Sequence, residues 1–170
     1  MCGRFSLHVE AAALAEVFQL PEEPSWTPRY NIAPSQAVAT IAQTASSAHQ
    51  FRLLRWGLIP SWAKDEAIGN KLINARAETV AEKPSFRAAF KQRRCLILAD
   101  GFYEWQRLNT KKKQPHYFQR SDAQPFAFAG LWEHWQHGEA VIDSCTIITT
   151  QANELLEPIH DRMPVMLAAD

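Results

Sequence analysis

The cysteine at position 2 is the residue of this chain whose position allows the most specific chemistry. Met1 before so small a side chain is normally removed, which would leave Cys2 with a free α-amine and a thiol on adjacent carbons. An α-amine titrates at about 7.7–8.0 and a lysine amine at about 10.4, so roughly 30% of the former is unprotonated at pH 7.4. We therefore expect Cys2 to trap an aldehyde as an imine, which the thiol closes into a thiazolidine. The plainer alternative is a second-position cysteine with no chemical task.

Two further polar residues interrupt runs that are otherwise apolar or turn-like. Asn74 follows Ile73 after a long loop, and Glu104 stands between Tyr103 and Trp105 at the end of a hydrophobic run. Strand alternation could turn the Glu104 side chain to solvent. If it points inward instead, burial should raise the pKa of this carboxyl and suit it to proton transfer near neutral pH.

A histidine near the end of the chain is a third candidate. His160 lies in a tight segment with Asp161 and Arg162, and histidine titrates in the range that acid–base chemistry needs. A histidine between such neighbours is also a common structural residue. Cys2, His160 and an acid could instead form the site of a thiol peptidase, because the groups of such sites meet in space and not in sequence. The spacing does not separate this alternative from imine chemistry.

Arginines accompany the candidate reactive residues. The candidates are Arg4, Arg29, Arg76 and Arg162, each inside a motif-like stretch of the sequence. Their guanidinium groups could bind the phosphates that flank a reacting nucleotide. A second basic cluster, at residues 87–94, is typical of a solvated helix face. The histidines and the scattered cysteines show no metal-ligand spacing, so we expect neither a metal nor a cofactor.

Length and composition restrict the class of protein. The chain has 170 residues, 46% of them hydrophobic, which suits one globular domain with its own core. Its 18 basic and 18 acidic side chains cancel, so a nucleic acid would have to be held by a local cluster of charge. The sequence has no apolar run of the roughly 20 residues that a membrane span needs, and no secretion signal. Three separated cysteines favour reduced thiols in the cytosol or nucleus.

Hydrophobic periodicity predicts many strands and few helices. An amphipathic helix is expected at 9–20, with shorter helices at 84–92 and 152–156. Residues 57–71 are expected to form a long loop with one helical turn. Apolar or alternating runs predict strands at 37–43, 50–56, 95–99, 102–108, 116–120, 126–132, 145–150 and 163–167. This order favours an α+β, mainly β fold, in which a curled, barrel-like mixed sheet carries a few short helices.

Six short blocks of the sequence together resemble the SOS-response-associated peptidase (SRAP) family, the abasic-site processing proteins. They run in family order nearly from one end of the chain to the other. The blocks are Met1-Cys2-Gly3-Arg4-Phe5, Pro28-Arg29-Tyr30-Asn31-Ile32-Ala33-Pro34, Trp56-Gly57-Leu58-Ile59-Pro60-Ser61-Trp62, Asn74-Ala75-Arg76-Ala77-Glu78-Thr79, Gly101-Phe102-Tyr103-Glu104-Trp105 and Ile159-His160-Asp161-Arg162-Met163-Pro164.

The resemblance implies a protein that binds single-stranded DNA and traps the open-chain aldehyde of an abasic site as a thiazolidine crosslink. Carried onto this chain, Cys2 would be the nucleophile through both its amine and its thiol. Asn74 would orient the reacting sugar and the α-amine. Glu104 would move protons during imine formation, ring closure and release of the 3′ strand, and His160 would assist the acid–base steps and reversal of the crosslink. The peptidase label of the family records a suspected autoproteolysis that exposes the cysteine.

The same resemblance implies which residues contact DNA, what the partner is and where the protein acts. Arg4, Arg76 and Arg162 would hold phosphates around the lesion, and Trp105 and Trp62 would stack on splayed bases or wedge against them. The expected partner is single-stranded DNA that contains abasic sites. No membrane and no obligate protein partner are expected, so we expect a cytoplasmic monomer, associated with the nucleoid in a bacterium.

We expect one SRAP domain over residues 1–170. Family members continue beyond the strand at Met163-Pro164 with residues that pack on the domain, so this chain is expected to lack that C-terminal tail. Two other functions stay open at this level. One is a thiol peptidase that acts on its own N-terminus or on other chains. The other is a non-enzymatic single-strand binding module in which Cys2 is incidental.

Overall fold

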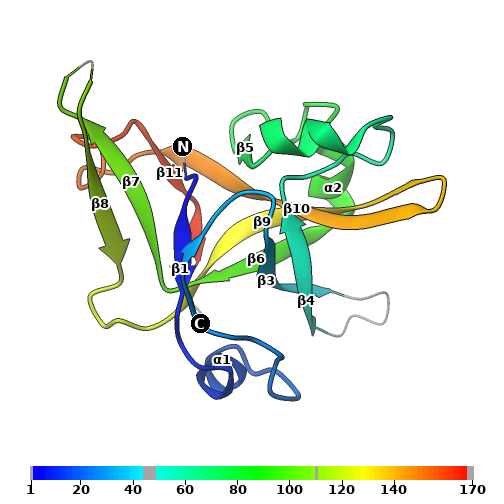
Figure 1. Ribbon diagram of the computed structural model, residues 1–170, viewed down its shortest axis with the longest axis horizontal. Helices are drawn as coiled ribbons and strands as arrows, with labels where there is room; N and C mark the ends of the chain where they lie inside the picture. Colours follow the sequence, from blue (N-terminus) through cyan, green and yellow to red (C-terminus); the bar gives the residue numbers. More distant parts are fainter. Residues whose placement is uncertain (1, 44–48, 110, 168–170) are drawn as a thin grey trace.

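The computed structural model describes residues 2–43, 49–109 and 111–167, and this part of the chain is mainly β (Figure 1). Its helices are α1 (Ala11–Val17), the 3-10 helix η1 (Glu66–Lys71) and α2 (Arg87–Gln92). Its strands are β1 (Phe5–Leu7), β2 (Arg29–Ile32), β3 (Ala37–Gln43), β4 (His49–Trp56), β5 (Asn74–Arg76), β6 (Arg94–Ala99), β7 (Gly101–Arg107), β8 (Lys113–Gln119), β9 (Phe126–His137), β10 (Ala140–Gln151), β11 (Arg162–Pro164) and β12 (Met166–Leu167).

Five strands close into a barrel. β3 pairs with β4 on one side and with β6 on the other, β6 continues to β9, and β9 forms a long antiparallel hairpin with β10. β10 then pairs in parallel with β4, with Ser144 opposite Arg55 and Cys145 opposite Trp56, which closes the ring. One parallel contact among antiparallel ones makes the sheet mixed. The predicted mainly β, barrel-like mixed fold is therefore confirmed.

Large aromatic side chains fill the core where the N-terminal strand meets the barrel. The Phe5 ring packs edge-on against Trp56 at 5.1 Å between centroids and against Phe128 at 5.6 Å. All three side chains are fully buried, and burial of a side chain of this kind contributes about 1.5–3 kcal/mol to stability. The segment that begins with Cys2 is thus anchored to the core three residues further on.

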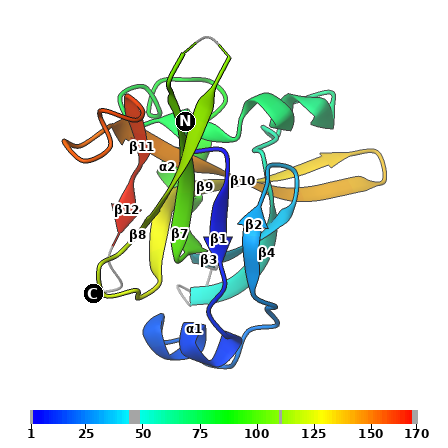
Figure 2. The same ribbon diagram turned by 60° about the vertical axis from the view of Figure 1, so that its left-hand side comes forward.

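A second sheet, in the order β2-β1-β7-β8, lies against the barrel and holds the start of the chain. β1 runs antiparallel to β7, with Phe5 opposite Phe102. The backbone N–H of Tyr103 donates to the carbonyl of Arg4 at 2.9 Å, so the contact between the two segments continues just before β1. Figure 2 shows β1 alongside β7, with the β7–β8 hairpin standing in front.

Two short strands, β5 and β11, pair with the C-terminal part of β10. Thr149 of β10 lies opposite Arg76 of β5 in a parallel pairing and opposite Pro164 of β11 in an antiparallel one. Asn74, at the start of β5, and the segment that leads into β11 therefore approach the same end of β10.

Some predicted elements are wrong. Residues 152–156 do not form a helix: the structure has hydrogen-bonded turns at 154–159, and the helix-like bonds from Leu156 and Glu157 to the carbonyl of Asn153 do not continue into further helical turns. The predicted final strand is interrupted at Val165, which separates β11 from β12. The backbone N–H of Val165 donates to the carbonyl of Ile148 in β10, and its carbonyl accepts from the N–H of Ala129 in β9. The first helix is shorter than predicted, whereas the helical turn in the long loop is confirmed as η1.

The connections that follow the predicted strands at 37–43 and 102–108 fall partly outside the described residues, at 44–48 and at 110. Among the residues that the structure describes, no helix is long and apolar enough to cross a membrane.

Candidate active site

Cys2 lies just before β1 and is fully buried among core side chains. Burial raises the pKa of its thiol well above the ordinary value, and the negative charge of Glu104 raises it further. The positive charge of the chain's amino terminus and a hydrogen bond from the Arg4 backbone act in the opposite direction. The thiol is therefore neutral at physiological pH, and a carboxyl close enough to affect its titration stands beside it.

Glu104 points into the protein from β7, and only 2% of it is exposed. Of the two orientations considered from the sequence, the structure has the inward one. Burial raises the pKa of this carboxyl and Asp161 adds to the rise, while the positive amino terminus and the N–H of Trp105 oppose it. A carboxyl with a raised pKa can hold and release a proton closer to neutral pH than an ordinary glutamate does.

Asn74 opens β5, where its backbone lies opposite Ile147 of β10. Both polar atoms of its side chain, Oδ1 and Nδ2, are buried and have no hydrogen-bond partner in the described parts of the chain. Buried polar groups in native proteins are nearly always paired. An amide of this kind can offer one acceptor and one donor group to a bound molecule.

His160 lies on the turn before β11, with 29% of its side chain exposed. Its Nδ1 accepts a hydrogen bond from the backbone N–H of Arg162 at 3.0 Å and lies 3.0 Å from Oδ1 of Asp161. A ring whose Nδ1 accepts this N–H carries its neutral-state proton on Nε2. Partial burial and the positive amino terminus lower the pKa of His160, and Asp161 opposes them. The imidazole is therefore mainly neutral at pH 7 and available as a base.

Three of the four predicted reactive residues share one electrostatic environment. The amino terminus acts on the pKa of Cys2, of Glu104 and of His160. A hydrogen bond of 3.1 Å from Nε2 of Gln106 to the carbonyl of Pro158 also ties β7 to the segment that carries His160. Asn74 enters from β5, on the strand that shares the end of β10 with β11.

Arg162 is bound within the protein. Its guanidinium donates to both carboxylate oxygens of Glu78, at 2.7 and 3.0 Å, and to the carbonyl of Thr149 at 2.8 Å. The hydrogen bond from Arg162 lowers the pKa of Glu78 to about 2. This arrangement fixes β11 to the end of β10 next to His160. A phosphate at Arg162, which the sequence predicts, would have to compete with Glu78.

The other predicted DNA-binding residues lie nearer to solvent. Nη1 of Arg4 donates to Oδ1 of Asn31 on β2 at 2.8 Å, and Arg76 is exposed at the end of β5. Trp62 and Trp105 are 58% and 37% exposed, which leaves their rings accessible to a base. Binding of DNA by these side chains stays a prediction.

Sequence reasoning missed the partners that hold the site together. Glu78 and Asn31 bind the two arginines, and Asp161 affects the pKa of both Glu104 and His160. The only signal available was that each stands inside one of the six blocks. Nothing in their spacing indicates which arginine or acid each one faces.

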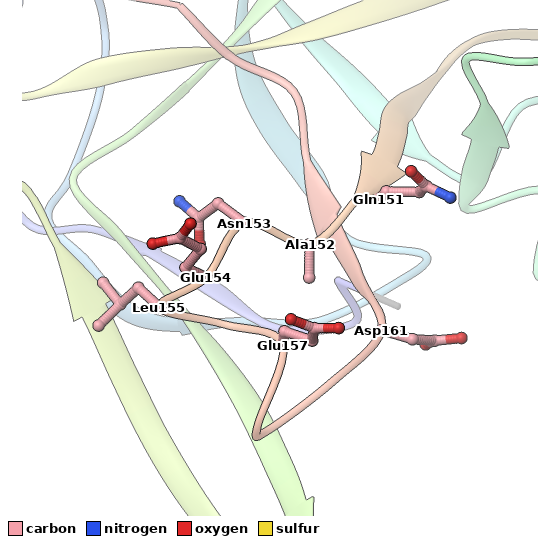
Figure 3. Close-up of a pocket in the computed structure, with 7 residues that line it drawn as sticks. All are labelled: Gln151, Ala152, Asn153, Glu154, Leu155, Glu157 and Asp161. Atoms are coloured by element: carbon pink, nitrogen blue, oxygen red, sulfur yellow. The ribbon is translucent and has the colours of Figure 1, made fainter.

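An open concavity of about 860 Å³ lies on the turn that follows β10 and is bordered by Asp161, the residue after His160 in the sequence (Figure 3). It is lined by Gln151, Ala152, Asn153, Glu154, Leu155, Glu157 and Asp161. Three of these side chains are carboxylates and none is a cation, so the surface repels phosphate groups. Within residues 2–43, 49–109 and 111–167, no three His, Cys, Asp or Glu side chains are placed to share a metal ion.

Comparisons with known proteins show which proteins this chain is similar to. The protein named abasic site processing protein YoqW from Bacillus subtilis (strain 168) is 52% identical over 171 residues, which cover 98% of this chain and 76% of that protein. Abasic site processing protein YedK from Escherichia coli (strain K12) is 32% identical over 177 residues, which cover 100% of this chain and 77% of that protein.

A solved structure has the same fold. The crystal structure of a protein from Bacteroides thetaiotaomicron superposes with a TM-score of 0.86 at 28% identity, over 98% of this chain and 77% of the other. The family described as SOS response associated peptidase (SRAP) matches residues 1–170. On these grounds the chain belongs to the SOS response associated peptidase family.

Proposed function

We propose that this chain processes abasic sites in single-stranded DNA by forming a thiazolidine crosslink through Cys2 once Met1 has been removed. The names of the relatives, which are abasic site processing proteins, support this class of reaction. The observation that carries the proposal is the burial of the Cys2 thiol beside Glu104, a carboxyl whose own pKa is raised.

The first step uses the amine of Cys2. Its lone pair attacks the aldehyde carbon of the ring-opened sugar, and water leaves as the C=N bond of the imine forms. One proton must leave the nitrogen and another must reach the departing hydroxyl. Glu104 is proposed to carry both, because a group with a raised pKa accepts and donates protons near neutral pH.

The second step closes the ring. The sulfur of Cys2 bonds to the imine carbon, and its proton passes to the nitrogen, so that the S–H adds across the C=N bond. A neutral thiol suits this step because the whole S–H group is consumed, and Glu104 can relay the proton. Asn74, whose buried amide has no partner in the described chain, is proposed to bind the sugar and the α-amine during both steps.

Release of the 3′ strand can start from the same imine. A base removes a proton from the carbon next to the imine, its electron pair forms a C=C bond, and the phosphate at the β carbon leaves. His160 is mainly neutral at pH 7 and can act as this base with Glu104. The proposed activity is therefore of crosslinking and lyase type.

A thiol peptidase is less well supported by the geometry. Thiol peptidases use a thiolate whose pKa is lowered by a neighbouring cation or helix N-terminus. The Cys2 thiol has the opposite environment, because burial and the carboxyl of Glu104 raise its pKa by more than the positive amino terminus lowers it. An autopeptidase that removes Met1 stays the alternative proposal.

DNA is proposed to lie over Arg4 and Arg76, with the exposed rings of Trp62 and Trp105 against the bases next to the lesion. The acidic concavity bordered by Asp161 would keep the phosphates to the side of these arginines. Arg162 would contact a phosphate only if that phosphate displaced Glu78, and it otherwise positions the His160 segment.

Mass spectrometry of the intact protein with an abasic single-stranded oligonucleotide tests the proposal. The protein without Met1 should gain the mass of the oligonucleotide less one water, in an adduct that survives denaturation. Cys2→Ala keeps an α-amine and should give only an imine that is lost unless it is reduced, whereas Cys95→Ala, which changes another buried cysteine, should still form the stable adduct. A denaturation-resistant adduct in unreduced Cys2→Ala would refute the mechanism.

A further inference from the structure

The β7–β8 hairpin has an outer face of which the proposed function uses only Trp105. Strand alternation turns Glu104 inward, so its neighbours along β7 point to the other side. The strand register places three pairs of residues on that other side, namely Tyr103 with Tyr117, Trp105 with Pro115, and Arg107 with Lys113. We refer to these six residues as the outer face of the hairpin.

Aromatic rings occupy the half of the outer face nearer the barrel. Tyr103 lies 4.9 Å from Tyr117 and 6.4 Å from Trp105 between ring centroids. The Tyr117 hydroxyl hydrogen-bonds with Oγ of Ser6 at 2.8 Å, and the Tyr103 hydroxyl donates to the carbonyl of Tyr30 at 2.9 Å. Tyr117 and Trp105 are nevertheless 39% and 37% exposed. The two tyrosine rings are therefore fixed in place before any ligand arrives, which lowers the entropic cost of stacking on them.

Cations occupy the free end of the hairpin. Arg107, Lys111, Lys112 and Lys113 are exposed, and none of their side chains has a hydrogen bond or an ion pair with another described residue. Glu104 is the one acidic residue in the sequence from 101 to 119, and it is buried on the opposite face. The hairpin is thus positively charged in a chain whose net charge is zero.

The edge of β7 gives a route from the reactive face to this outer face. β1 pairs with β7 only at Ser6–Gly101 and Phe5–Phe102, so from Glu104 onward β7 has no paired strand on that side within the described chain. A nucleotide strand held at Cys2 can therefore pass this edge and continue over Trp105.

We infer that the outer face of the β7–β8 hairpin is a second DNA contact surface, which binds the unpaired strand that continues from the lesion. Aromatic rings stack on any base, and the contribution is about 1–3 kcal/mol per base. The free lysines match the phosphates of the same strand. Duplex DNA does not fit this surface because its bases already stack on one another. The inference rests on the proposed function, since the strand is the one that carries the abasic site.

Binding of undamaged single-stranded DNA tests the inference without the covalent step. Fluorescence anisotropy with a labelled 20-nucleotide strand is measured from 50 to 200 mM salt, with every protein carrying Cys2→Ala. The variant K111Q/K112Q/K113Q is expected to bind roughly tenfold more weakly at low salt. The slope of log binding constant against log salt concentration should also be smaller in magnitude by about 2, because each phosphate that the lysines no longer neutralise contributes about 0.7. The matched control R87Q/K91Q/R94Q removes the same charge from α2 and the start of β6, and it should bind as the parent does.

A second measurement separates this inference from the proposed function. Proteins with Cys2 intact are given a short abasic oligonucleotide with one nucleotide on each side, which minimises its contact with the lysines. The triple lysine variant should crosslink it at the parent rate. If the parent protein forms no crosslink, the proposed function fails. If the lysine variant binds the long strand with unchanged affinity and slope, or if the α2 control loses as much, the second surface does not exist.

Discussion

Replacement of Asp100 by alanine is expected to loosen the strand that places Cys2. Asp100 lies between β6 and β7 and is 3% exposed. Its carboxylate accepts hydrogen bonds from Oγ of Ser6 at 2.6 Å, from the backbone N–H of Val9 at 3.1 Å and from that of His8. One side chain therefore holds both β1 and the turn that follows it.

The expected loss follows from the donors that the alanine would leave behind. The Ser6 hydroxyl is in a buried residue but keeps the Tyr117 hydroxyl as a hydrogen-bond partner at 2.8 Å, whereas the two backbone N–H groups, which are in half-buried residues, lose their acceptor. A fully buried donor without an acceptor costs about 1–3 kcal/mol, and water reaches a half-buried one more easily. We expect Asp100→Ala to lower the free energy of unfolding by about 2 kcal/mol. Asp100→Asn keeps one acceptor oxygen and should lose less.

Urea unfolding gives the stability change as a shift of the midpoint at unchanged slope. The control is Asp122→Ala, which removes an exposed acid that bonds to Arg120 and to a neighbouring backbone N–H, and it should unfold as the parent does. Crosslinking by Asp100→Ala is then measured at a temperature where the variant is folded, and its rate should fall. A stability loss below about 1 kcal/mol, or a folded Asp100→Ala protein that crosslinks at the parent rate, would show that Asp100 does not place Cys2.

Three further changes probe single features. The pKa of the Glu104 carboxyl is raised in the folded protein from the value of 4.5 that applies to the unfolded chain, so the folded protein keeps the carboxyl proton to higher pH. The contribution of Glu104 to stability therefore falls as the pH rises from 4.5 to the folded-state pKa. Glu104→Gln should thus be more stable than the parent at neutral pH and equal to it below about pH 4.5, as urea midpoints across that range will show. Gly101→Ala puts a Cβ where the ring and hydroxyl of Tyr117 already lie, so its melting temperature should fall, by an amount that corresponds to about 1–3 kcal/mol. Arg162→Met should return the pKa of Glu78 from about 2 toward 4.5, as a carbon-detected NMR titration would report; an unchanged pKa would contradict the observed pairing.

The longer strands could be predicted because each carries its own pattern. The run at 37–43 matches β3 in full, and the run at 95–99 misses only the first residue of β6. By contrast β1 and β5 have three residues each and were not predicted, and β11, also of three residues, was predicted only as part of one strand at 163–167. Three residues are too few to show a period, so partners elsewhere in the chain define these strands. They are also the strands next to Cys2, Asn74 and His160.

The candidate site was predictable in its residue types but not in its contacts. Strand alternation along β7 does not show whether the Glu104 side chain points into the protein or to solvent. Only the packing of β7 against the barrel decides between these two orientations. The Arg162–Glu78 pair joins residues 84 positions apart, and no local pattern connects them. The segment at 152–156 has a sequence that suits a helix, but the chain reverses direction between β10 and β11 so that these two strands pair antiparallel.

Burial of the Cys2 thiol also constrains the order of the proposed steps. A thiol with a raised pKa is a poor first nucleophile, because the thiolate is the reactive form. The α-amine keeps a useful unprotonated fraction at neutral pH, so the amine has to react first and bring the carbon to the sulfur. Ring closure is then intramolecular, and the closeness of the sulfur to the imine carbon compensates for the low nucleophilicity of a buried, neutral thiol. The same burial protects an otherwise reactive thiol from oxidants while no lesion is bound.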